Sequence, residues 1–165
     1  MFSNGFIAHM NLDRFDLKLL AAVQADGRLT NEVLGERVGL SAASCQRRLK
    51  RLRDDGIILR DVAVLSGDEV GWPLLVLVQV SLERDRADII DSFKRSIHKT
   101  AEIMSGYYVT GDADFVLLVA AENIKSYEEF TRRFFYENAD IKGFKTMVVM
   151  DAVKHSLALP LRPPV

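Results

Sequence analysis

The sequence predicts an α+β protein with two domains, an N-terminal winged helix-turn-helix domain and a C-terminal ferredoxin-like βαββαβ sandwich. Two observations predict the first domain: apolar residues recur at helical spacing in three short segments before residue 56, and a tight turn separates the last two segments. The order of the β-rich and helical segments after residue 72 predicts the second domain. With 165 residues and 48% hydrophobic content, the chain is large enough for two small cores.

The chain shows no sign of a membrane-bound or secreted protein. Its longest strongly apolar run, residues 74–80, is interrupted by Gln79 and is far shorter than a membrane-spanning helix. No charged segment followed by an apolar one opens the chain, and either Met1 or Met10 fits as the first residue. Cys45 is the single cysteine, which excludes an internal disulfide and fits a reducing cytosol. We therefore expect a cytoplasmic protein.

The first domain is expected to span residues 11–65, after a flexible extension at residues 1–10. The first of its three helices has Asp13 and Asp16 near its N-terminus, where the helix dipole favours negative charge. Thr30 and Ser41 are suitable N-caps for the second and third helices, and Gly39 and Gly56 are suitable terminators. The expected helices cover residues 13–24, 31–38 and 42–54. Residues 57–65 are expected to form a wing, or a strand that leads out of the domain.

The third expected helix has two different faces. At about 100° per residue, Cys45, Leu49 and Leu52 share one narrow apolar sector. The other side is polar and basic, with small residues near its start: Ala43, Ser44, Gln46, Arg47, Lys50 and Arg51, with Arg48 at the flank of the apolar sector. Gln pairs with adenine and Arg with guanine, and small residues allow close approach to base edges. The pattern is typical of a helix that enters the major groove of DNA.

The charge distribution supports this interpretation. The formal net charge of −1 combines +2 in residues 1–61 with −3 in the rest of the chain. Six basic residues, and no acid, lie between Arg37 and Arg53. Such a cluster is by itself usually a solvated helix face, but on the second helix of a helix-turn-helix it predicts contact with nucleic acid.

The second domain is expected at residues 73–160, after a linker at residues 66–72 and before a tail at residues 161–165. Its strands and helices are expected in the order β 73–82, α 86–98, β 104–110, β 114–121, α 125–137 and β 144–153. This order gives a four-stranded sheet with two helices on one face. His98 and His155 are isolated from any second ligand at metal spacing, so we expect neither a metal nor a cofactor.

Several stretches resemble the leucine-responsive/asparagine-regulator (Lrp/AsnC) family of transcription regulators. The helix-turn-helix stretch is the more specific part of the resemblance, and the Gly-Asp-x-Asp turn would be weak alone. The resemblance covers residues 10–160, and the matching stretches are residues 12–16 (LDRFD), 26–28 (DGR), 40–52 (LSAASCQRRLKRL), 56–58 (GII) and 109–115 (VTGDADF).

The resemblance implies a regulator whose N-terminal domain binds palindromic promoter DNA as a dimer or larger homo-oligomer, a tetramer or octamer. By position, the residues that would contact DNA are Ser41, Ala43, Ser44, Gln46, Arg47 and Lys50. Arg28 precedes the second helix, where it either holds a phosphate or is solvated. Arg48 and Arg51 either reach phosphates or pair with acids such as Asp54 or Asp55.

The resemblance also implies that the second domain is a RAM domain (regulation of amino-acid metabolism), which pairs subunits and binds a small effector, commonly an amino acid, between dimers. The residues expected to border that pocket are Tyr108, Thr110, Gly111, Asp112 and Asp114. By itself, the same stretch is an ordinary turn. Ala113 replaces a large aromatic residue of the family, so the pocket is expected to be larger or to lack the usual ligand. Gly35 replaces an alanine, which lowers helix propensity by about 1 kcal/mol.

Two other classes of function compete with this interpretation. Sirohaem decarboxylases share the architecture, but their His-Asn-Tyr and Trp-Phe-Thr stretches correspond here to residues 105–108 and 114–117, SGYY and DFVL. No nucleophile–base pair or carboxylate constellation replaces these motifs, so we do not expect an enzyme. An interaction module that has lost DNA binding is disfavoured by the intact basic helix.

Overall fold

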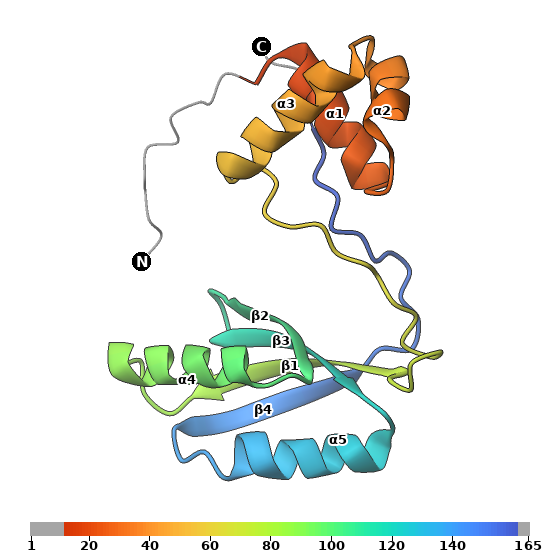
Figure 1. Ribbon diagram of the computed structural model, residues 1–165. Helices are drawn as coiled ribbons and strands as arrows, with labels where there is room; N and C mark the ends of the chain where they lie inside the picture. Colours follow the sequence, from red (N-terminus) through yellow and green to blue (C-terminus); the bar gives the residue numbers. More distant parts are fainter. Residues whose placement is uncertain (1–11, 162–165) are drawn as a thin grey trace. The chain divides into compact units, whose positions relative to one another are not determined.

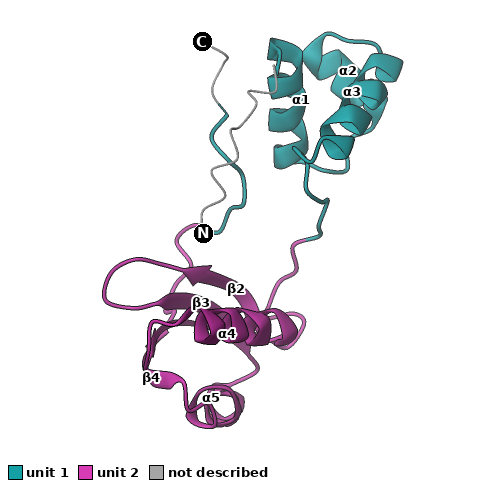
Figure 2. Cartoon of the chain, turned by 90° about the vertical axis from the view of Figure 1, so that its left-hand side faces the viewer, with its two compact units in different colours: residues 1–63, 155–165 teal, residues 64–154 magenta. Residues whose placement is uncertain are grey.

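The structure is a computed structural model that describes residues 12–161, and these residues form two compact units. Residues 12–63 and 155–161 make up one, which we call the helical unit, and residues 64–154 make up the other, the sheet unit (Figure 2). Residues 155–160, expected in the second domain, thus group with the helices. The Gln24 side chain of the first helix binds this segment: its Nε2 donates to the Leu159 carbonyl (3.2 Å), and its Oε1 accepts from the Leu159 N–H (2.7 Å).

The helical unit contains α1 (Arg14–Ala25), α2 (Asn31–Val38) and α3 (Ala42–Asp54). Each helix begins at a side chain that accepts hydrogen bonds from the first turn: Asp13, Thr30 and Ser41. The expected N-caps of α2 and α3 are confirmed. Gly39 ends α2 in the left-handed conformation, with φ at 78°, which only glycine adopts without strain.

The core of the helical unit consists of apolar side chains from all three helices. These are Leu19, Leu20, Leu34, Val38, Cys45, Leu49 and Leu52. Burial raises the pKa of the Cys45 thiol, as expected for a cysteine that serves as a packing residue. Because Leu49 and Leu52 are buried with Cys45, the apolar sector predicted for α3 is confirmed.

The expected strand at residues 57–65 is not formed. Ile57 and Ile58 donate their N–H groups to the Leu52 carbonyl at 2.9 and 3.0 Å, and their side chains pack on the helical core. Residues 59–65 are exposed and have no strand beside them in the described chain. A strand needs a partner for its backbone hydrogen bonds, and alternating apolar residues alone do not supply one.

The sheet unit has the predicted βαββαβ order (Figure 1). Its four strands pair antiparallel in the order β2-β3-β1-β4. The elements are β1 (Leu74–Leu82), α4 (Ala87–Lys99), β2 (Ile103–Tyr108), β3 (Phe115–Ala121), α5 (Ile124–Thr131), a π-helical turn η1 (Arg132–Tyr136) and β4 (Ile141–Val148). No helix among residues 12–161 is both long enough and apolar enough to cross a membrane.

The two faces of this sheet differ in what covers them. The inner face, with Val76, Val78 and Val80 of β1, is fully buried against α4 and α5. The ring of Phe134 lies 5.8 Å from that of Phe93 on α4 and 5.3 Å from that of Phe130 on α5, so the two helices are adjacent over this face. No helix among residues 12–161 covers the outer face, which leaves the following apolar side chains half-buried or exposed: Leu75, Leu77, Tyr107, Val116, Leu118 and Met147.

Candidate functional site

The outward side of α3 contains most of the residues expected to contact DNA. Ser41, Ala43, Gln46, Arg47 and Lys50 are exposed, and Ser44 is half-buried beside the N-cap. The Ser41 hydroxyl accepts from the Ser44 N–H at 3.3 Å, which determines where the helix begins. The exposed amide and guanidinium groups therefore lie opposite the buried sector of the same helix, as a groove-reading helix requires.

Two arginines expected either to reach phosphates or to pair with acids form ion pairs with residues at the start of α1. Arg48 Nη1 donates to Asp13 Oδ2 (2.7 Å) and to Asp16 Oδ1 (2.8 Å). Arg51 Nη2 donates to the other oxygen of Asp16, at 2.6 Å. Arg48 thus pairs with acids other than the expected Asp54 and Asp55, whereas Arg51 also approaches Asp55, at 4.0 Å. Both arginines therefore have acid partners in this structure, and their contact with phosphates stays a prediction.

Asp16 is the residue of this network that sequence reasoning missed. Its side chain is 1% exposed and accepts from Arg48, from Arg51 and from the Asp13 N–H at 3.1 Å. The residue was assigned to the helix dipole, although its position in the wheel of α1 beside Leu19 and Leu20 signals burial. A buried carboxylate requires positive partners, and basic residues at positions 48 and 51 share one flank of α3.

The hydrogen bonds of this network shift the pKa values of Asp13 and Arg48. The pKa of Asp13 lies below its ordinary value, because the Asp16 N–H and then the Arg48 guanidinium donate to its carboxylate. The pKa of Arg48 is raised by its hydrogen bonds to Asp13 and then Asp16. The formal charges of the two aspartates and the two arginines cancel, so this network adds no formal net charge to the helical unit.

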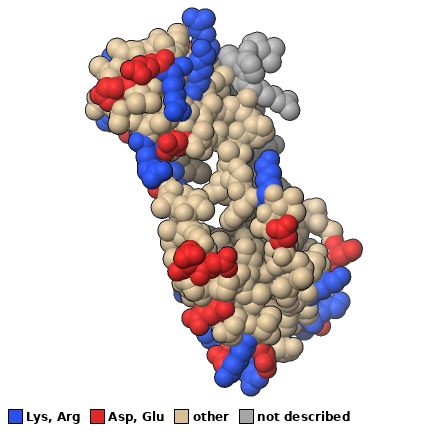
Figure 3. Space-filling view, turned by 90° about the vertical axis from the view of Figure 1, so that its right-hand side faces the viewer, with Lys and Arg blue, Asp and Glu red and all other residues tan. Residues whose placement is uncertain are grey.

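The remaining cations of α3 differ in whether they have a carboxylate partner. Lys50 pairs with Asp54 at 2.5 Å and Arg53 with Asp61 at 3.2 Å. Among the described residues, Arg47 is the one cation of α3 whose side chain has no hydrogen bond or ion pair. On the face drawn in Figure 3, basic side chains accordingly lie beside acidic ones in both units. Arg28 is 96% exposed, and its Nε lies 3.8 Å from Asp26.

The turn at residues 109–114 joins β2 to β3 and is held to β1. Gly111 adopts φ of 116°, a left-handed conformation that favours glycine. Asp114 accepts the Leu82 N–H on its Oδ2 at 2.7 Å and donates its own N–H to the Val80 carbonyl at 2.9 Å. Val80 and Phe115 are the last paired residues of β1 and β3, so Asp114 satisfies a backbone donor of β1 that lies beyond the start of β3 and has no ladder partner there.

The residues expected around the effector therefore have different roles in the fold. The Asp114 carboxylate already binds the chain's own backbone, whereas Asp112 and Thr110 are exposed. The Tyr108 ring lies 5.1 Å from the Phe115 ring, and Lys94 Nζ lies 5.0 Å from the centroid of the Tyr108 ring. The turn thus presents an exposed carboxylate, a hydroxyl and an aromatic ring in one short stretch of chain.

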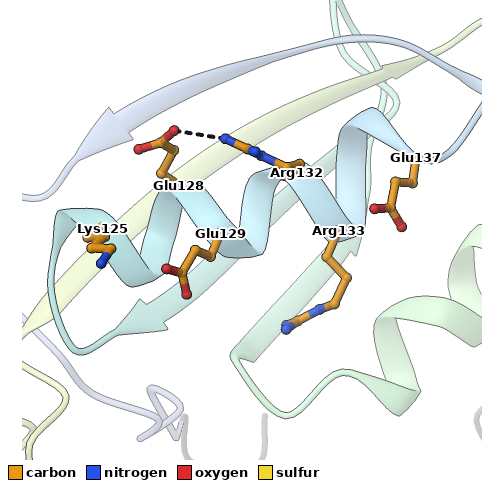
Figure 4. Close-up of a pocket in the computed structure, with 6 residues that line it drawn as sticks. All are labelled: Lys125, Glu128, Glu129, Arg132, Arg133 and Glu137. Carbon is orange, nitrogen blue, oxygen red and sulfur yellow. Dashed lines mark hydrogen bonds and ion pairs between the residues drawn. The ribbon is translucent and has the colours of Figure 1, made fainter.

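The hollow drawn in Figure 4 is not at this turn. It has a volume of about 310 Å³ and lies along α5 and η1, where charged side chains line it: Lys125, Glu128, Glu129, Arg132, Arg133 and Glu137. Glu128 and Arg132 pair across one helical turn at 3.2 Å. Alternating charges of this kind are typical of a solvated helix face. Among the described residues, no group of three His, Cys, Asp or Glu side chains is placed to hold a metal ion.

Comparison with known proteins places both units in families. Residues 12–58 match the family described as winged helix-turn-helix DNA-binding, and residues 75–159 match the Lrp/AsnC ligand binding domain. The HTH-type transcriptional regulator y4tD of Sinorhizobium fredii is 62% identical over 152 residues, which cover 92% of this chain and 90% of that protein. The leucine-responsive regulatory protein of Escherichia coli K12 is 32% identical over 152 residues, which cover 92% of this chain and 93% of that protein.

Solved structures agree with these matches. A transcriptional regulator of Neisseria meningitidis, in complex with L-methionine, is 34% identical, with a TM-score of 0.86 over 90% of this chain and 96% of that one. A feast or famine regulatory protein of Mycobacterium tuberculosis, complexed with L-methionine, is 26% identical, with a TM-score of 0.79 over 90% and 98%. These relatives are regulators, and the chain is a transcription regulator rather than an enzyme. The chain belongs to the Lrp/AsnC family of helix-turn-helix transcription regulators, with a DNA-binding domain and a ligand-binding RAM domain.

Proposed function

We propose that the protein binds imperfect palindromic promoter sites as a homodimer or larger assembly, and that a small effector, an amino acid, modulates this binding. The observation that carries the proposal is the outward side of α3, where Gln46, Arg47 and Lys50 are exposed opposite the buried Cys45 and Leu49. In a twofold dimer, two such helices enter successive major grooves about 34 Å apart.

We assign base contacts to Gln46 and Arg47, with Ser41, Ala43 and Ser44 allowing the start of the helix to approach the groove. Lys50 and Arg28 are assigned to phosphates, because each is exposed and has only a surface acid as partner. Arg48 and Arg51 are left out of the contact set, because Asp16 and Asp13 bind their guanidinium groups.

A second copy of the chain is the proposed occupant of the outer sheet face. Leu77 of β1 is 37% exposed and is in register with Leu118 of β3 and Met147 of β4, so three apolar side chains lie in one row across the sheet. Such an uncovered apolar surface is typical of a subunit interface. Because a twofold interface brings the same patch together from both subunits, this row can pair with its own copy.

The proposed effector site is the turn at residues 109–114 together with Tyr108 at the end of β2. Asp112, which is exposed, is assigned to the ammonium group of an amino acid, and Tyr108 and Thr110 border its side chain. Gly111 and Asp114 hold the turn in shape. The relative from Neisseria meningitidis contains L-methionine and that from Escherichia coli is named leucine-responsive, which supports an apolar amino acid. The effector acts only through different affinities for two states of the assembly.

Replacing Arg47 tests the assignment of α3. The DNA is a duplex selected from a random pool by the wild-type protein, and binding is measured by fluorescence anisotropy. We expect Arg47→Ala to weaken binding by about 1–3 kcal/mol, roughly 5- to 150-fold, because a base-edge contact is lost. Arg132→Ala is the matched control, since it removes an exposed arginine from η1 in the sheet unit. Unchanged affinity and salt dependence for Arg47→Ala would contradict the assignment.

A further inference from the structure

The buried carboxylate of Asp16 joins the first helix of the helical unit to the helix proposed to contact DNA. Its two oxygens are divided between two guanidinium groups, Oδ1 to Arg48 at 2.8 Å and Oδ2 to Arg51 at 2.6 Å. The Asp16 side chain is 1% exposed, whereas those of Arg48 and Arg51 are 23% and 49% exposed. The contacts span 32 and 35 residues of chain, so they depend on the packing of α1 against α3.

The position of the two arginines explains why this matters for DNA binding. Arg48 follows Arg47 and Arg51 follows Lys50, so both are sequence neighbours of residues on the proposed contact face. A free arginine at the edge of a DNA-contacting helix reaches backbone phosphates, and such contacts raise the affinity for every sequence equally. A guanidinium group bound to a buried carboxylate is not available for this contact, because its departure would leave a buried negative charge without that positive partner.

We propose that Asp16 is a positioning residue that withholds Arg48 and Arg51 from DNA phosphates and thereby sets the ratio of specific to non-specific affinity. The inference rests on the proposed role of α3 as the DNA-contacting helix. Asp16 then does more than stabilise the fold, because it controls the number of DNA phosphates that α3 neutralises. Arg47, which has no carboxylate partner among the described residues, then carries a larger share of the sequence choice.

Asp16→Asn tests the proposal, since asparagine keeps the size of the side chain but presents one acceptor oxygen instead of two. Binding is measured by anisotropy against the selected duplex and a scrambled duplex of equal composition, over a series of salt concentrations. We expect tighter binding to the scrambled duplex and a smaller ratio between the two duplexes. The slope of log affinity against log salt should steepen by about 0.9 for the release of Arg51, because Arg48 keeps its hydrogen bond to Asp13.

Two further variants distinguish the loss of a negative charge from the release of an arginine. Glu36→Gln removes one negative charge from an exposed position of α2 that has no ion pair among the described residues, and it should leave the salt slope unchanged. Asp16→Asn combined with Arg51→Gln should return the slope toward the wild-type value, because the released guanidinium is gone. A purely structural role of Asp16 predicts no such rescue.

Three outcomes would overturn the proposal. One is a folded Asp16→Asn variant, by circular dichroism, that weakens both duplexes equally without a change in slope. Another is a slope that stays steep in the double variant. The third needs no Asp16 variant: Arg51→Gln alone should leave the wild-type slope intact, and a slope shallower by about 0.9 would show that Arg51 already contacts phosphate. Failure of the α3 assignment itself is detected separately by Arg47→Ala.

Discussion

At the scale of single residues, Asp13 serves both as a helix cap and as an ion-pair partner. Its Oδ1 accepts from the N–H groups of Phe15 (2.8 Å) and Asp16 (2.9 Å), and its Oδ2 accepts from Arg48. These hydrogen bonds, first of all that from Asp16, hold the pKa of Asp13 below the ordinary 3.8. The unfolded chain therefore takes up the proton of Asp13 at a higher pH than the folded chain does.

This pKa shift predicts a component of acid sensitivity. Stability from Asp13 is complete above pH 3.8, the ordinary value, and is lost as the pH falls through the lower folded pKa. We expect Asp13→Asn, which keeps a capping acceptor, to lose less stability than the wild type as the pH falls below 3.8. Urea unfolding at several pH values measures this, with Asp68→Asn in the exposed linker as control. Equal acid sensitivity of Asp13→Asn and wild type would contradict the prediction.

Asp112 allows the effector assignment to be tested separately from DNA binding. A thermal-shift screen against the twenty amino acids should show stabilisation of the wild type by an apolar amino acid. Asp112→Ala should abolish that shift, because the ammonium group loses its carboxylate partner. Asp140→Ala, at an exposed position before β4, is the matched control. An unaltered shift in Asp112→Ala would place the pocket elsewhere, and a flat screen on DNA-binding protein would indicate a regulator without an amino-acid effector.

At the scale of elements, Gly35 shows how closely α2 approaches the turn that follows it. A Cβ atom at Gly35 would lie 2.5 Å from the Leu40 carbonyl oxygen, which belongs to the backbone and cannot rotate away. The Gly35 carbonyl in turn accepts from the N–H groups of Gly39 and Leu40, at 2.9 and 3.0 Å. The glycine that lowers helix propensity is therefore the residue that lets α2 meet the turn before α3.

Gly35→Ala sets these two effects against each other. Alanine favours the helix by about 1 kcal/mol, but overpacking against backbone costs about 1–3 kcal/mol. We expect net destabilisation, measured as a lower midpoint of thermal unfolding. Gly143→Ala is the control, because nothing lies within 4 Å of a Cβ at that position of β4. A raised unfolding midpoint for Gly35→Ala would contradict this expectation. It would mean that the turn moves to accommodate the methyl group and that the gain in helix propensity is the larger effect.

The elements also show where sequence reasoning succeeds and where it does not. The caps Thr30 and Ser41 and the apolar sector of α3 were predictable because they depend on neighbours within one helical turn. The partners of Asp16 were not, because the contacts cross more than thirty residues and follow from packing. The structural role of the Asp114 carboxylate was not predictable, because the sequence does not show that β1 extends beyond the start of β3 and leaves the Leu82 N–H for this side chain.

At the scale of the whole molecule, the outer sheet face predicts self-association. We expect Leu77→Asp to shift the protein toward monomers in sedimentation velocity, because it places a charge in the apolar row with Leu118 and Met147. Ile124→Asp is the control, since Ile124 is 61% exposed at the start of α5 and lies outside that row. The monomer should also lose more affinity for a full palindrome than for a half-site. A Leu77→Asp variant with the wild-type sedimentation coefficient would exclude this face as the dimer interface.

The path of the chain through its two units has a consequence for their communication. The sheet unit, residues 64–154, is inserted between the two segments of the helical unit, residues 12–63 and 155–161. In polymer terms it lies within a larger loop that the hydrogen bonds between Gln24 and Leu159, 135 positions apart in the sequence, close. The entropic cost of closing a loop rises with the number of flexible residues in it. A ligand that stiffens the inserted unit therefore makes docking of the second segment less costly, and coupling between the units follows from chain connectivity alone.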